Sequence, residues 1–239
     1  MSVLRLLVFV LAAAAAGACA GLPPPRTLPE AAPAAEAAWQ ALRFRFTWPP
    51  GLDPAWHLDS LFADRLVRPI LEEEGPAIPL WRFHRRAVRD AAGHQLSFLF
   101  RADSATARRV RHAAVSHPLV ARARQAGCLA EIVAEEGAGP APLSDTSDPS
   151  WPPALREAWP HYIAGVSRMW LELVRAFAPP ADPPGDGEAF ETLENGFRET
   201  ERRIRALWRT QGLHAFLHHL NALFGYEPVA IGEERRLRF

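Results

Sequence analysis

The chain has 239 residues, of which 49% are hydrophobic, and its 27 basic side chains balance 27 acidic ones. This apolar content suffices for one substantial core, or for a core with a smaller helical lobe. The charge balance argues against a general nucleic-acid-binding protein and against a disordered acidic chain. The basic residues are all arginine, which excludes chemistry that depends on lysine, such as Schiff-base formation or a P-loop.

The N-terminus has the pattern of an export signal. Arg5 provides a basic start, residues 6–16 form an apolar run of eleven, and small residues follow up to Ala20. The run is shorter than the roughly 20 apolar residues that a membrane-spanning helix needs. We therefore expect residues 1–19 to be an export signal and residues 20–38, rich in proline and alanine, to be a tether.

The segment Ala16-Gly17-Ala18-Cys19 resembles the lipobox of bacterial lipoproteins, although that family usually has a larger aliphatic residue where Ala16 stands. The resemblance implies that Cys19 becomes the new N-terminus and carries lipid, including palmitate. With Ala20 after the cysteine, it also implies an outer-membrane location facing the periplasm. Two alternatives stay open: cleavage after Ala20, which gives a secreted or periplasmic protein, and a cytoplasmic protein with a chance apolar start.

Residues 39–136 alternate predicted strands and helices. The strands, recognised by period-two alternation, are residues 42–48, 80–88, 94–101 and 129–134. Asp53 is expected to cap a first helix that Pro54 begins and Gly75 ends, and Asp103 or Ser104 to begin a second that breaks at Pro118. The order β-α-β-β-α-β predicts an α+β fold with the ferredoxin-like, split βαβ arrangement.

Residues 150–225 are expected to form three helices packed on this domain, followed by a tail over residues 226–239. Pro160 should kink or restart the first helix, Gly212 should end the second, and Gly225 should close the third. The second helix has three charge pairs at i,i+4 spacing, which we expect on its solvent side: Glu194–Arg198, Glu199–Arg203 and Glu201–Arg205.

Three short segments of the first domain resemble the tailoring domain of thiopeptide-type bacteriocin biosynthesis proteins. They are Arg68-Pro69-Ile70 at a helix end, Trp81-Arg82-Phe83 on a strand, and the turn from Asp90 to His94. That family follows the histidine with an arginine-rich strand, whereas Gln95, Leu96, Ser97 and Phe98 stand here. The resemblance therefore implies a fold and carries no activity to this chain.

Strand alternation also predicts a cationic sheet face. It places the aromatic residues of the strands on one side and six cationic residues on the other: Arg43, Arg45, Arg82, His84, Arg86 and Arg101. Such a face could hold a phosphate, a carboxylate or a sulfated sugar through arginine forks. Alternatively, it is a solvated surface partly neutralised by Glu131 and Glu135, or it is covered by the C-terminal helices with internal ion pairs.

Other patterns point away from catalysis. His214 and His218 have the spacing of two metal ligands on one helix face, but no third ligand can be placed. Cys128 has no histidine close in sequence and is expected to be a small buried core residue. No GxSxG or paired-carboxylate motif occurs. We therefore expect no catalytic residue, metal, cofactor or nucleic-acid partner.

These patterns together predict an exported, lipid-anchored accessory protein that binds an envelope protein or an anionic ligand. The alternative is an exported enzyme with a site between the sheet and the C-terminal helices, using His84 or His94 with flanking arginines.

Overall fold

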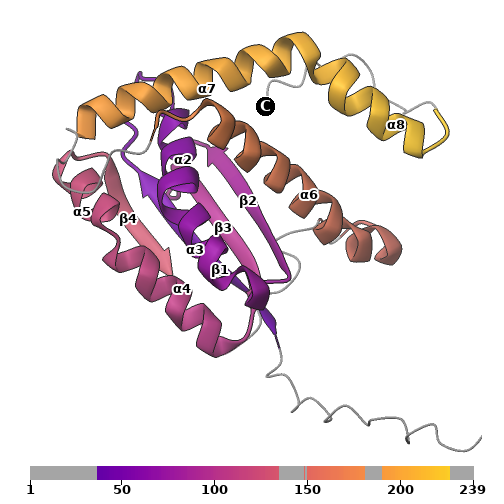
Figure 1. The fold of residues 1–239 in the computed structure, drawn as a ribbon, viewed down its shortest axis with the longest axis horizontal. Helices are drawn as coiled ribbons and strands as arrows, with labels where there is room; N and C mark the ends of the chain where they lie inside the picture. Colours follow the sequence, from indigo (N-terminus) through magenta and orange to yellow (C-terminus); the bar gives the residue numbers. More distant parts are fainter. Residues whose placement is uncertain (1–36, 135–147, 149, 181–189, 227–239) are drawn as a thin grey trace, which may run out of the picture. The chain divides into compact units, whose positions relative to one another are not determined.

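The computed structural model describes residues 37–134, 148, 150–180 and 190–226. Within these residues the chain forms a four-stranded antiparallel sheet with helices against one face and along one edge (Figure 1), which confirms the α+β class. The predicted export signal, the tether up to residue 36 and the tail beyond residue 226 lie outside the described residues. None of the described helices is long and apolar enough to cross a membrane.

The strands are β1 (Ala38–Phe46), β2 (Leu80–Ala87), β3 (His94–Ala102) and β4 (Leu129–Ala134), in the order β2-β3-β1-β4. All four predicted strands are confirmed, with β1 beginning at Ala38. The β2–β3 hairpin closes where Asp90 accepts backbone hydrogen bonds from Ala92 and Gly93. Gly93 has φ +61°, a left-handed conformation that glycine adopts without steric cost.

The core lies on the aromatic face of the sheet, as alternation predicts. Phe44, Leu96, Phe98 and Phe100 are fully buried there. The helices that cover them are α2 (Trp56–Phe62), α3 (Arg68–Glu74), α4 (Ser104–Ser116) and α5 (Pro118–Gln125). A π-helical stretch, Ala63–Val67, joins α2 to α3 just before Pro69. Proline lacks a backbone N–H, and the π-helical turn lets the helix pass this gap without ending.

The predicted start of one helix agrees with the structure, and the predicted cap of another does not. Asp103 accepts a hydrogen bond of 2.7 Å from the backbone N–H of Thr106 and so caps α4, which begins at Ser104, one of the two predicted start residues. The predicted cap by Asp53 is wrong, because α2 begins at Trp56 and its N-cap residue, Ala55, makes no side-chain hydrogen bond.

Helix α6 (Pro153–Phe177) runs beside the edge strand β2, where the backbone N–H of Phe83 donates to Ser167 Oγ at 3.0 Å. The predicted restart of the helix at Pro160 is wrong, since the helix continues through this buried residue, and the alternative of a kink there stays a prediction. Helix α7 (Phe190–Gly212) packs against α2 and buries Phe197 completely. The C-terminal helices thus belong to the same core as the sheet.

The predicted stop at Gly212 is also wrong. This residue has right-handed helical angles, φ −57° and ψ −39°, and the chain continues as a π-helical stretch η4 (Leu213–His218) and α8 (His219–Leu223). A separate third C-terminal helix is therefore not confirmed, although Figure 1 shows a bend here. A Cβ at position 212 would lie 3.0 Å from the Trp208 ring, so this glycine makes room for the indole.

Candidate functional site

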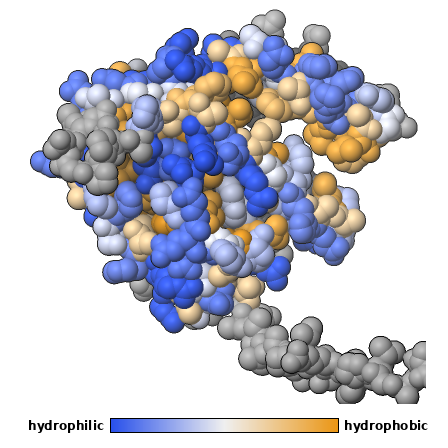
Figure 2. Space-filling view, viewed as in Figure 1, coloured by the Kyte–Doolittle hydropathy of each residue, from blue (hydrophilic) through white to orange (hydrophobic). Residues whose placement is uncertain are grey.

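A cavity of about 680 Å³ opens between β2, α6, α7 and η4. We call it the aromatic pocket. Figure 2 shows the hollow between α6 and the α7–α8 arm, with hydrophobic side chains along the arm. The cavity is lined mainly by apolar side chains, among them Trp159, Ile163, Val166, Met169, Trp170, Leu173, Ile204, Leu207, Trp208 and Phe216. Its volume falls in the range of sites that enclose small molecules.

The pocket exists because α6 and α7 carry more apolar surface than the core covers. Of the predicted stripe on α6, Leu171 and Val174 are buried in the core, whereas Trp170 is only partly covered and faces the cavity. On α7, Trp208 remains 54% exposed and stacks on Phe216 with ring centroids 5.6 Å apart. Apolar walls left uncovered in this way commonly mark a binding site.

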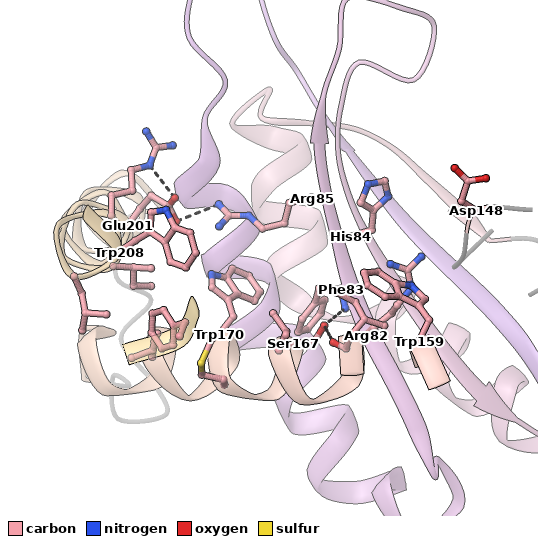
Figure 3. Close-up of a pocket in the computed structure, with 18 of the residues that line it drawn as sticks. Arg82, Phe83, His84, Arg85, Asp148, Trp159, Ser167, Trp170, Glu201 and Trp208 are labelled. Atoms are coloured by element: carbon pink, nitrogen blue, oxygen red, sulfur yellow. Dashed lines mark hydrogen bonds and ion pairs between the residues drawn. The ribbon is translucent and has the colours of Figure 1, made fainter. Parts of the chain in front are cut away.

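Arg85 lies at the inner end of the pocket and extends from β2 toward α7 (Figure 3). Its Nε donates to Asp59 Oδ2 at 2.9 Å, and its Nη2 donates to Glu201 Oε2 at 3.1 Å. Its guanidinium lies over the rings of Trp170 and Trp56, at 4.8 Å and 5.2 Å from their centroids. Burial by itself lowers the pKa of Arg85, but the two carboxylates outweigh burial and raise it.

Further polar groups extend this network between α2 and α7. Ser60 Oγ donates to Glu201 Oε2 at 2.8 Å, and His94 Nε2 lies 3.1 Å from Asp59 Oδ1. His57 Nε2 lies 2.9 Å from Glu194 Oε1, and burial is the main cause that lowers the pKa of His57. Within the described residues, Ser60 therefore bonds to one carboxylate while His94 and His57 each face another.

The sequence prediction placed Glu194 and Glu201 on the solvent side of α7, which is wrong. Glu201 is only 7% exposed, and both carboxylates face α2. Their spacing of seven residues was the available signal, because it places them on the same helix face as Phe197 and Ile204, which are buried. The i,i+4 pair of Glu201 with Arg205 is present as well, with Arg205 Nε at 3.1 Å from Oε1.

The strand register places the six predicted cationic residues on the face opposite the core: Arg43, Arg45, Arg82, His84, Arg86 and Arg101. His84 and Arg101 are exposed, whereas Arg82 is buried. Arg45 Nη1 donates to Glu131 Oε2 at 2.7 Å, so the expected partial neutralisation by Glu131 is present. Glu135 lies outside the described residues.

The pKa of His84 reports the local field on this cationic face. It is lowered, first by desolvation and then by the positive charges of Arg82, Arg86 and Arg43. The face also contains a small apolar cluster of Trp39, Ala41 and Leu99, which was not predicted because the expected first strand begins at residue 42. Two of the predicted residues, Arg82 and His84, also line the aromatic pocket.

The remaining candidates are separated in the structure. His94 is fully buried on the core side of the sheet and His84 lies on the opposite face, so the two histidines cannot share one site. Cys128 is half-buried at the edge of the core rather than fully buried, and burial raises the pKa of its thiol. The rings of His214 and His218 lie nearly parallel, 5.6 Å apart. Among the described residues, no group of three or more histidine, cysteine or acidic side chains could hold a metal.

No family model matches the chain, and no curated protein or solved structure is similar to it.

Proposed function

We propose that this protein is a binding protein whose aromatic pocket holds the apolar part of a small molecule. The observation that carries the proposal is a cavity of about 680 Å³ whose walls come from four separate elements, β2, α6, α7 and η4. Aromatic and aliphatic side chains line the cavity, and a ligand that they cover would gain about 25 cal/mol per Å² of apolar surface removed from water. The network around Arg85 fixes α2, β2 and α7 relative to one another, so the inner end of the pocket is preformed.

A neutral fluorescent probe tests this proposal. N-phenylnaphthylamine fluoresces strongly in apolar surroundings, so its titration into the purified full-length chain should give saturable binding. Val166→Phe fills part of the pocket and should weaken binding about tenfold or more. Val115→Phe makes the same change at an exposed position of α4 and should leave the affinity unchanged. Equal affinity in all three proteins would contradict the proposal.

We also propose that the protein is anchored by lipid at Cys19, in the bacterial cell envelope and facing the periplasm from the outer membrane. The support is the lipobox-like segment that ends at Cys19, which lies outside the described residues. Radiolabelled palmitate should enter the wild type and the Cys128→Ala variant but not Cys19→Ala. Labelling of all three, or of none, would contradict a lipid anchor at Cys19.

We further propose the ferredoxin-like arrangement for residues 39–136. Its support is the element order β-α-β-β-α-β together with the strand order β2-β3-β1-β4. The resemblance to the thiopeptide-type bacteriocin biosynthesis domain stays a prediction at the level of fold.

The cationic sheet face is a second candidate site, for an anionic ligand or for an acidic patch on an envelope protein. The strand register favours it, because it places Arg43, Arg82 and Arg86 on the same face as His84. Desolvation is the main cause that lowers the pKa of His84, and these three arginines lower it further, a contribution that a bound anion would offset. Phosphate should therefore raise the His84 pKa, measured by NMR titration at constant ionic strength. An equal response to chloride would indicate screening alone. The alternative of an enzyme with a His/Arg site between the sheet and the C-terminal helices would place His84 at the rim of the aromatic pocket.

A further inference from the structure

A second hollow of about 310 Å³ adjoins the aromatic pocket on α7. It is polar and is lined by Arg198, Arg202, Arg205 and Arg209, with His57 and Trp56 from α2 at its side. Glu201 and Arg205 line both hollows, so the two cavities meet at this pair of side chains. We call the second cavity the arginine hollow.

Three of the four arginines that line the arginine hollow form salt bridges with glutamates of α7. Arg198 pairs with Glu194, Arg202 with Glu199 and Arg205 with Glu201. Arg209 differs, because Arg205 and Ala206 occupy the positions four and three residues before it. Among the described residues, no carboxylate forms a salt bridge with Arg209. The hollow therefore has a surplus of positive charge at the Arg209 end, and Arg205 next to it is of the same sign.

We infer that the ligand of this protein is an anionic amphiphile, with its apolar part in the aromatic pocket and its acid group in the arginine hollow beside Arg209. This inference rests on the proposed binding function of the aromatic pocket and names the class of its ligand. A carboxylate or phosphate at this place would gain charge-assisted hydrogen bonds from arginine. The apolar part would stay in contact with the tryptophan side chains of α6 and α7.

Two probes that differ by one charged group separate this inference from the proposed function. Anilinonaphthalene sulfonate has the aromatic rings of N-phenylnaphthylamine and adds a sulfonate. With the full-length chain at one fixed concentration of a non-ionic detergent, the wild type should bind the anionic probe several-fold more tightly than the neutral probe. Failure of the neutral probe to bind would instead reject the proposed function itself.

Two arginine variants assign the effect to the hollow. Arg209→Gln should weaken the anionic probe about fivefold, the size of a partly solvated ion pair, and should leave the neutral probe unchanged. Arg203→Gln removes the same charge from the same helix, but Arg203 pairs with Glu199 and lines neither cavity. Equal losses in the two variants, or equal affinity of the wild type for the two probes, would overturn the inference.

Competition then identifies the acid group. Dodecanoate offers a carboxylate, and a short-chain phosphatidic acid offers a phosphate on a lipid backbone. Displacement of the anionic probe by either compound, with the loss of that displacement in Arg209→Gln, supports the inference. The compound that acts at the lower concentration shows whether the source is a free fatty acid or a phospholipid. If neither displaces the probe, the anionic amphiphile is excluded.

Discussion

Replacing Arg85 with methionine removes the cation that Asp59 and Glu201 share while it keeps an unbranched side chain of similar reach. Asp59 is fully buried and the Glu201 side chain is 10% exposed, so both carboxylates would lose this partner in a poorly solvated place. Breaking a buried ion pair costs about 3–5 kcal/mol. Because the Arg85 side chain retains 22% exposure, we expect the lower end, about 3 kcal/mol.

A loss of about 3 kcal/mol should lower the melting temperature by about 6–12 °C for a chain of this size, measured by circular dichroism near neutral pH. Arg86→Met is the matched control. Arg86 is the next residue on β2 but lies on the cationic face and pairs with exposed Asp90, so its loss should cost less than about 1 kcal/mol.

The deficit of Arg85→Met should depend on the two carboxylates that Arg85 contacts. Without the cation, the buried side chains of Asp59 and Glu201 lose an opposite charge in a poorly solvated place, which is costly. Adding Asp59→Asn and Glu201→Gln removes these two negative charges, so it should largely relieve the deficit. A deficit of the same size in the triple variant would refute this reasoning and indicate lost packing instead.

Three further outcomes are expected. Phe197→Ala should lower the free energy of unfolding, measured in urea, by about 3–5 kcal/mol, because the ring is fully buried between α7 and the core. An unchanged urea midpoint would mean that α7 folds independently. Trp170→Ala should lower the free energy of unfolding less than Phe197→Ala does, since Trp170 is only partly buried, but it should abolish binding of the neutral probe, since Trp170 lines the pocket. A larger loss of stability with unchanged binding would contradict its place in the pocket wall. Burial lowers the pKa of His57, so the unfolded chain takes up a proton before the folded chain does, and the stability should fall as the pH drops below 6.5. The urea midpoint should therefore fall less steeply with pH in His57→Gln than in the wild type, and equal slopes would contradict this prediction.

The sheet could be predicted from the sequence because its signals are local. Alternation over two residues fixes which face a strand residue occupies, and it placed Phe44 on the core side and Arg43 on the cationic side. The turn at Asp90 and the helix cap at Asp103 involve bonds to residues two and three positions away. A short stretch of sequence contains all that these features require.

The aromatic pocket could not be predicted in this way, because it depends on how α6 and α7 lie against β2. The wide apolar stripe around Trp170 signalled contact with some surface, but it did not distinguish core from cavity wall. Tertiary packing also overrode local signals at Gly212, which makes room for Trp208 where a helix stop was expected. Likewise Glu201 was predicted to face solvent, and its partners in the fold, Arg85 and Ser60, lie far from it in the sequence.

The hydrogen bond from the Phe83 backbone to Ser167 has a consequence for how copies of this protein behave toward one another. β2 is an edge strand, and an uncovered edge offers backbone donors and acceptors on which a strand of a second chain can add. α6 occupies this edge and takes one of those donors with a side chain. The opposite edge, β4, has only six residues and places charged Glu131 outward. Detachment of α6 would therefore uncover a template for intermolecular strand pairing, and the docked helix keeps the folded chain from aggregating through its sheet.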